Sequence, residues 1–123
     1  MPDQKGREGM PDVEHVLQMT KELNESICQT EDYLRYQDSL NRLRDRREVY
    51  EKLNEYRRKN LRLNDLEEGY EEAVDALYNE YIDILNIPEV MDFMSWETRV
   101  NRMLRRVFNC IAEGVYIDIS YMD

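Results

Sequence analysis

The chain has 123 residues, 36% of them charged, a formal net charge of -10, and only four glycines, three prolines and two cysteines. This length predicts one domain, and the shortage of Gly and Pro favours an all-α fold over folds built from short strands and turns. The sequence has no apolar run of about 20 residues for a membrane span, no secretory signal at its start, and too much negative charge for general nucleic-acid affinity. Two cysteines do not make a disulfide framework, so we expect a cytoplasmic protein.

Residues 1–11 are polar and without periodicity, and we expect a flexible N-terminal tail there. A helical domain is expected over residues 12–115. Asp12 is a candidate N-cap for its first helix, whose apolar residues share one face: Val13, Val16, Leu17, Leu23 and Ile27. Thr30 is expected to cap the second helix, because acidic residues follow it and suit the positive end of the helix dipole.

The segment 31–64 has two interpretations. Asp45 either caps a third helix, or one bent helix runs across residues 44–48, since no Gly or Pro forces a break there. Gly69 then marks a turn, and the apolar spacing predicts a helix from Tyr70 to about residue 85. Pro88 ends that helix and suits the first turn of the next one.

The last helix is expected to run from Pro88 to about Gly114, which makes it the longest element. It carries two apolar stripes, and together they are wider than one neighbouring helix covers. Either the helix lies centrally in its own bundle, or one stripe packs against a second subunit. The predicted self-association stripe is Phe93, Trp96, Val100, Met103 and Val107, and the other stripe is Val90, Met94, Leu104, Phe108 and Ile111. After Gly114 the chain is expected to form a C-terminal tail over 116–123 that folds over the bundle, rather than a strand paired with a partner.

Charge is segregated along the sequence. Residues 31–64 contain ten bases and seven acids, whereas residues 65–98 contain eleven acids and no base. We expect the basic segment to fold back beside the acidic one, with the surplus acids forming a surface that attracts a basic partner. The predicted acidic surface is Glu71, Glu72, Asp75, Glu80 and Asp83.

Residues for catalysis or metal binding are scarce. His15 is the only imidazole and is expected to be a solvated surface residue. A di-iron helical bundle needs two Glu-x-x-His pairs, so this chain lacks that site. Cys28 and Cys110 are expected to be small buried hydrophobes, with a metal or cluster shared with another chain as the alternative. We therefore expect no enzymatic activity and no cofactor.

Several motifs in order resemble the YlbF/YmcA family of small bacterial helical regulators over roughly residues 13–115. They are an E-x-Y-x-x-Y entry at Glu31, Tyr33 and Tyr36, an acidic step at Asp45, a Leu53/Tyr56 pair, and an N-x-P-x-V junction from Asn86 to Val90 before a long terminal helix. The resemblance implies an all-α protein that associates with itself or with paralogues and has no catalytic activity. It also implies a role in a complex that modulates a ribonuclease and mRNA processing, with effects on competence, sporulation or biofilm formation.

Two departures qualify this resemblance. Arg46 stands where many relatives have proline, which favours one continuous helix across this region. Relatives linked to iron–sulfur clusters are richer in cysteine, so no cluster is carried over. The sequence thus predicts an oligomeric antiparallel bundle of four to five helices with a long C-terminal helix, acting as a non-enzymatic adaptor. The rival hypotheses are an RNA-binding protein that uses Arg57 and Arg58, and a redox sensor that uses Cys28 and Cys110.

Overall fold

A computed structural model describes residues 9–122, and these residues form only helices and connecting segments. In chain order the helices are α1 (Val13–Cys28), α2 (Glu31–Asp45), α3 (Arg47–Arg62), η2 (Leu63–Asp65), α4 (Tyr70–Glu80), α5 (Ile82–Leu85), α6 (Pro88–Gly114) and η3 (Ser120–Met122). The all-α prediction is confirmed. No helix among the described residues has both the length and the apolarity that a bilayer crossing requires. Of the predicted N-terminal tail, residues 1–8 lie outside the described part of the chain.

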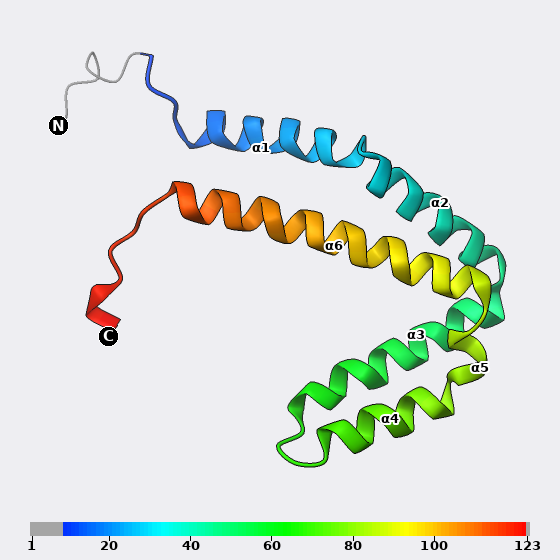
Figure 1. The fold of residues 1–123 in the computed structure, drawn as a ribbon. Coiled ribbons are helices and arrows are strands. Elements are labelled where there is room, and N and C mark those ends of the chain that lie inside the picture. Colours follow the sequence, from blue (N-terminus) through cyan, green and yellow to red (C-terminus); the bar gives the residue numbers. More distant parts are fainter. Residues whose placement is uncertain (1–8, 123) are drawn as a thin grey trace.

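The helices form two arms that diverge from a common corner (Figure 1). One arm contains α6 together with α1 and α2, and α6 packs chiefly on α2. The other arm is the hairpin of α3 and α4, which α5 connects to the start of α6 at the corner. The structure therefore differs from the predicted single antiparallel bundle, because the chain changes direction between α2 and α3 and again between α4 and α6.

The first two helices begin where the sequence predicts. The Asp12 side chain accepts a hydrogen bond from the backbone N–H of His15 at 2.9 Å. The Thr30 hydroxyl oxygen accepts one from the backbone N–H of Tyr33 at 3.2 Å. Each bond satisfies an amide that has no partner within the first turn of its helix.

The junction between α2 and α3 decides between the two interpretations of this segment: a third helix follows, but its N-cap residue is Arg46 and not Asp45. Arg46 has φ −98° and ψ 71°, so the helix breaks there, and Asp45 is the last residue of α2 rather than the cap of α3. The interpretation of one bent helix is wrong, and α3 starts without any side-chain cap. At this break the Arg46 guanidinium bonds Glu89 at the start of α6 at 2.9 Å.

The acidic segment begins at a glycine turn and contains a second break. Gly69 has φ 72°, a conformation that favours glycine, and α4 starts at the next residue as predicted. The predicted helix to residue 85 is interrupted at Tyr81, which has φ −109° and ψ 15°. A straight helix would rotate Leu85 by about 80° away from Leu77. The break allows Leu77, Tyr81 and Leu85 all to be buried.

Both ends of α6 agree with the sequence analysis. Pro88 occupies the first turn, where its missing N–H leaves no helical bond unmade. The helix continues for 27 residues to Gly114, about 40 Å at 1.5 Å per residue.

The apolar core lies at the corner where the two arms meet. It contains Leu43 of α2, Leu53 of α3, Leu77 of α4, Tyr81, Leu85 of α5, and Val90 and Phe93 of α6. Leu43, Leu53 and Val90 are fully buried. Burial of each such side chain contributes about 1.5–3 kcal/mol, so the corner holds the arms together.

Ion pairs connect the basic helix α3 to the acidic segments, as the charge pattern predicts. Arg46 pairs with Glu89, Arg57 with Glu97, and Lys59 with Glu80. These side chains are partly exposed, and such pairs contribute only about 0.2–1 kcal/mol each. They therefore determine how α3 is aligned against α4 and α6 more than how stable the fold is.

The segment after α6 forms no strand over residues 115–122 and ends in the short helix η3. Every residue of this segment is exposed, and in Figure 1 it turns away from α6. It is a tail, as predicted, but it does not fold over the helices.

Candidate interaction surface

Helix α1 is amphipathic but contributes no side chain to the core. None of its 16 residues is buried, although its apolar residues share one face. Val13, Val16 and Leu17 are 71%, 54% and 49% exposed, respectively. An amphipathic helix normally derives most of its stability from packing that face against another element. In this chain the apolar face of α1 is left without such a cover.

The apolar side chains of α6 are buried in the first half of the helix and exposed near its end. Val90, Phe93 and Val100 in its first half are buried. Phe108 and Ile111 in its second half are 66% and 53% exposed. The last turns of α6 therefore have an apolar face that α2 does not cover.

The predicted self-association stripe is divided by this change. Phe93 and Val100 are buried inside the chain, so in this fold they have no surface to offer a second subunit. Trp96, Met103 and Val107 are half-buried. Two guanidinium groups lie near the centre of the Trp96 ring, that of Arg35 at 6.0 Å and that of Arg99 at 4.9 Å. The exposed Phe108 and Ile111 of α6 belong to the other stripe, which was not the one predicted for self-association.

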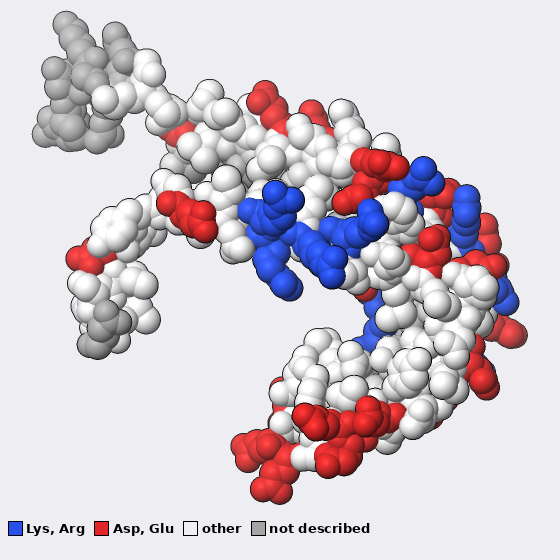
Figure 2. Space-filling model, viewed as in Figure 1, with Lys and Arg blue, Asp and Glu red and all other residues white. Residues whose placement is uncertain are grey.

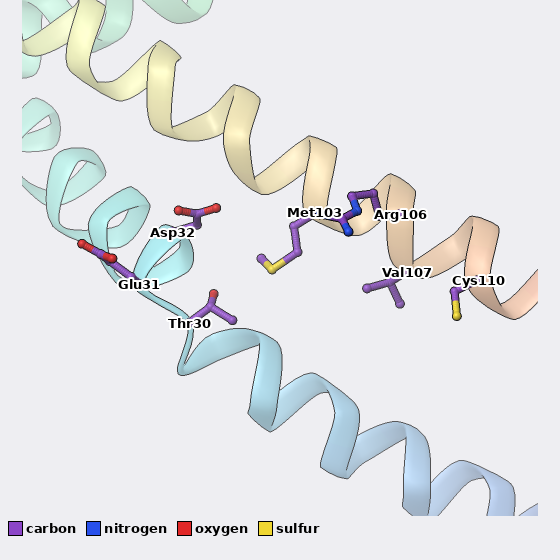
Figure 3. Close-up of a pocket in the computed structure, with 7 residues that line it drawn as sticks. All are labelled: Thr30, Glu31, Asp32, Met103, Arg106, Val107 and Cys110. Carbon is purple, nitrogen blue, oxygen red and sulfur yellow. The ribbon is translucent and has the colours of Figure 1, made fainter.

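A groove lies between the α1–α2 junction and α6, in the same arm (Figure 3). Its volume is about 480 Å³, and its lining residues are Thr30, Glu31, Asp32, Met103, Arg106, Val107 and Cys110. The walls combine apolar side chains with two carboxylates and one guanidinium. This lining has no imidazole and no paired nucleophile and base, so it is suited to contact with another chain rather than to catalysis.

The total surface of the chain is large for its mass. It exposes 10619 Å² at 15.0 kDa, whereas a compact monomer of that mass exposes about 7,000 Å². The difference of about 3,500 Å² means that this chain is less compact than a typical globular monomer of that mass. A stable interface requires only about 800 Å² from each partner, so this chain has ample surface for one.

The five predicted acidic residues lie on α4 and α5 but differ in their partners. All of them are exposed, and Glu80 pairs with Lys59 at 3.3 Å. Glu71 and Glu72 stand in the first turn of α4, at the free end of the hairpin, where negative charge suits the helix dipole. Figure 2 shows acidic side chains gathered at that end and basic ones on the side of α6 that faces the hairpin. The acidic surface is therefore divided between internal pairing with α3 and an exposed end.

The basic side chains of α6 form a row on its solvated face. They are Arg99, Arg102, Arg105 and Arg106, and all four are exposed. Arg99 approaches Asp32 at 3.9 Å, and Arg106 lines the groove. The basic residues of α3 have other roles: Arg57 pairs with Glu97 and its guanidinium lies 5.3 Å from the centre of the Phe93 ring.

The cysteines correct another expectation. Cys28 and Cys110 are free thiols and both are exposed, not buried. They are exposed because α1 has no cover and because Cys110 belongs to the part of α6 beyond α2. His15 is exposed at the start of α1, as predicted. Within residues 9–122 no three side chains of His, Cys, Asp and Glu type are placed to hold a metal ion.

Sequence reasoning identified the apolar face of α1 but not its importance. The face has the same periodicity as that of α3, which is packed, so periodicity alone does not reveal which helix lacks a neighbour.

Comparison with protein families identifies one match. Residues 16–116 match the family described as "Control of competence regulator ComK, YlbF/YmcA". No curated protein and no solved structure matches the chain. Because the match covers most of the chain, this protein belongs to the YlbF/YmcA family.

Proposed function

We propose that this member of the YlbF/YmcA family is a non-enzymatic regulatory adaptor that acts by binding other proteins. The family is described as controlling a competence regulator, which makes a regulatory role the natural premise. In detail, we propose a cytoplasmic protein that joins copies of itself or paralogous family members in a complex. That complex would modulate a ribonuclease and mRNA processing, and through it competence, sporulation or biofilm formation.

One observation carries this proposal: a whole helix of the chain has an apolar face with no cover. Helix α1 buries none of its residues, and Phe108 and Ile111 of α6 are exposed in the same arm. Exposed apolar patches of this extent mark sites of protein–protein contact. The groove beside them has no imidazole and no paired nucleophile and base, which supports binding over hydrolysis.

RNA binding is supported less well. The hypothesis depends on Arg57 and Arg58 of α3, but Arg57 is occupied by Glu97 and Phe93. A phosphate-binding surface needs several cations that are not already neutralised. The net charge of -10 opposes phosphate as well.

Affinity capture from the native cell tests the proposal. The tagged chain is expected to enrich a paralogous family member or a ribonuclease, and a Val16→Asp/Ile111→Asp variant is expected to lose that enrichment. Leu61→Asp is the matched control, because Leu61 is 70% exposed on α3, in the other arm. Salt-sensitive RNA binding that disappears in Arg57→Glu/Arg58→Glu, without any enriched regulator or ribonuclease, would overturn the adaptor role.

A further inference from the structure

A second groove, the corner groove, lies between the α3–α4 hairpin and the first half of α6, near the corner from which the two arms diverge (Figure 1). Its volume is about 400 Å³, within the range of about 300–1,000 Å³ that is usual for binding pockets. The hairpin and α5 contribute Tyr56, Tyr78 and Leu85 to its lining, and α6 contributes Met91 and Met94. Tyr78 and Met91 are 44% and 56% exposed. The floor of the corner groove is therefore an apolar surface that the chain leaves open.

The α6 side of the corner groove continues outward as a basic surface. Ser95 and Thr98 of α6 also line the groove. Arg102 and Arg105 follow Thr98 by four and seven residues, so they lie on the same face of the helix. They are about 6–10 Å further along it. Figure 2 shows basic side chains on the side of α6 that faces the hairpin.

The α4 side of the corner groove continues as an acidic surface. Asp75 and Glu71 precede Tyr78 by three and seven residues, which places both on the side of α4 where Tyr78 lies. Within residues 9–122, neither these two exposed carboxylates nor Arg102 and Arg105 form an ion pair inside the chain. The corner groove therefore has an apolar floor between two unpaired charged surfaces of opposite sign.

We infer that the corner groove binds an α-helical segment of another protein, whose apolar face has acidic residues along one flank and basic residues along the other. The inference rests on the proposed adaptor role and adds a contact surface separate from α1 and the end of α6. Amphipathic helices bind in apolar grooves of this kind, and the flexible side chains of methionines let such a groove adapt to its ligand.

The charges beside the groove specify the flanks of that helix. An acidic flank next to Arg102 and Arg105 and a basic flank next to Glu71 and Asp75 bring opposite charges together on both sides. A helix with a single sign of charge would meet like charges on one side. The corner groove thus favours a partner helix with segregated charges over a uniformly basic one, which the net charge of -10 alone would attract.

Fluorescence anisotropy tests this inference on the full chain, with a labelled, helix-stapled peptide of about 14 residues, about 21 Å long, as the probe. The peptide has leucines and one phenylalanine on one face, glutamates along one flank and lysines along the other. We expect micromolar binding, and at least about tenfold weaker binding of a permuted peptide in which both flanks mix the two charges.

A substitution in the floor locates the binding site. Met91→Asp places a charge in the apolar floor and is expected to weaken peptide binding at least about tenfold. Ile111→Asp makes the same kind of change on α6 outside the corner groove and should leave peptide binding unaltered. Both side chains are more than half exposed in the native chain, so both variants should keep their helical circular dichroism.

Charge reversal tests the two flanks. Arg102→Glu/Arg105→Glu and Glu71→Lys/Asp75→Lys are each expected to weaken peptide binding at least about tenfold. The variant that combines all four substitutions should recover binding, because the bound helix can then lie in the opposite direction and exchange its flanks.

Four outcomes overturn the inference. They are no binding of the peptide by the native chain, equal binding of the permuted peptide, equal losses in Met91→Asp and Ile111→Asp, and no recovery in the combined charge variant. A mass in light scattering that Met91→Asp lowers to the monomer value and Ile111→Asp leaves unchanged would show that a second copy fills the groove instead. If Met91→Asp still enriches a paralogue or ribonuclease in affinity capture, the proposed function stands even when the corner groove is excluded.

Discussion

Both arms contain amphipathic helices, but the apolar face is buried in the α3–α4 hairpin and left exposed on α1 in the other arm. In the α3–α4 hairpin, Leu53 and Leu77 are buried in the corner core, and the Tyr56 and Tyr81 rings lie 5.6 Å apart. In the other arm, α1 has an apolar face of similar periodicity and buries none of it. The comparison shows that an apolar stripe identifies a face that needs cover, whereas tertiary structure decides whether the chain supplies that cover itself.

The two phenylalanines of α6 give the strongest test of this contrast. Phe93 is 1% exposed and Phe108 is 66% exposed on the same helix. We expect Phe93→Ala to lower the free energy of unfolding by about 3–5 kcal/mol, because it removes a ring from the corner core. Phe108→Ala should change it by less than about 0.5 kcal/mol in the monomer.

Urea unfolding followed by Trp96 fluorescence at nanomolar concentration measures both variants without contribution from association. A large loss for Phe108→Ala under these conditions would mean that the end of α6 is packed within the single chain. The contrast between covered and uncovered halves of the helix would then be wrong.

The N-caps give a second, smaller test. Asp12 caps α1, and Thr30 caps α2, which is packed on α6. Replacing a capping side chain by alanine costs about 0.5–2 kcal/mol. Thr30→Ala should lower global stability by such an amount, whereas Asp12→Ala should fray only α1, because that helix shares no core with the rest.

Amide hydrogen exchange distinguishes local from global effects. For Asp12→Ala we expect faster exchange confined to residues 13–28, with unchanged protection in α3 and α6. Faster exchange in α3 as well would show that α1 is coupled to the corner core.

The smallest expected effect concerns pH and compares one tyrosine from each arm. Burial raises the pKa of Tyr36, with the Glu97 carboxylate as a second cause, and burial also raises the pKa of Tyr56. A folded-state pKa above the ordinary tyrosine pKa of 10.0 means that the native state holds these protons more tightly than the unfolded chain does. The resulting stability is complete below that value and is lost as the pH rises from it through the folded pKa.

The double variant Tyr36→Phe/Tyr56→Phe should therefore lose less stability than the native chain as the pH rises above the ordinary tyrosine pKa. Urea unfolding across an alkaline pH series measures this loss. Tyr50→Phe is the control with the opposite sign, because hydrogen bonds from Asn54 and Arg44 lower the pKa of Tyr50. If Tyr50→Phe reduces this loss of stability as much as the double variant does, burial of Tyr36 and Tyr56 is not the cause of the loss.

The sequence by itself determined the helices and most of their ends. Asp12, Thr30, Gly69 and Pro88 act through local hydrogen bonds and backbone preferences, which need no distant residue. Charge segregation also predicted that α3 would lie against the acidic segments, because opposite charges attract whatever the details of the fold. The family resemblance was based on short motifs, among them the junction around Pro88, and is confirmed by the match over residues 16–116.

Tertiary structure alone decided which faces are covered. At the break, Arg46 bonds Glu89, 43 positions later in the chain, and no local pattern reveals that contact. The burial of Phe93 and Val100, the exposure of both cysteines and the lack of cover on α1 follow from where the two breaks direct the helices. Periodicity fixes the direction of a side chain relative to its own helix, and only the path of the whole chain fixes what that side chain meets.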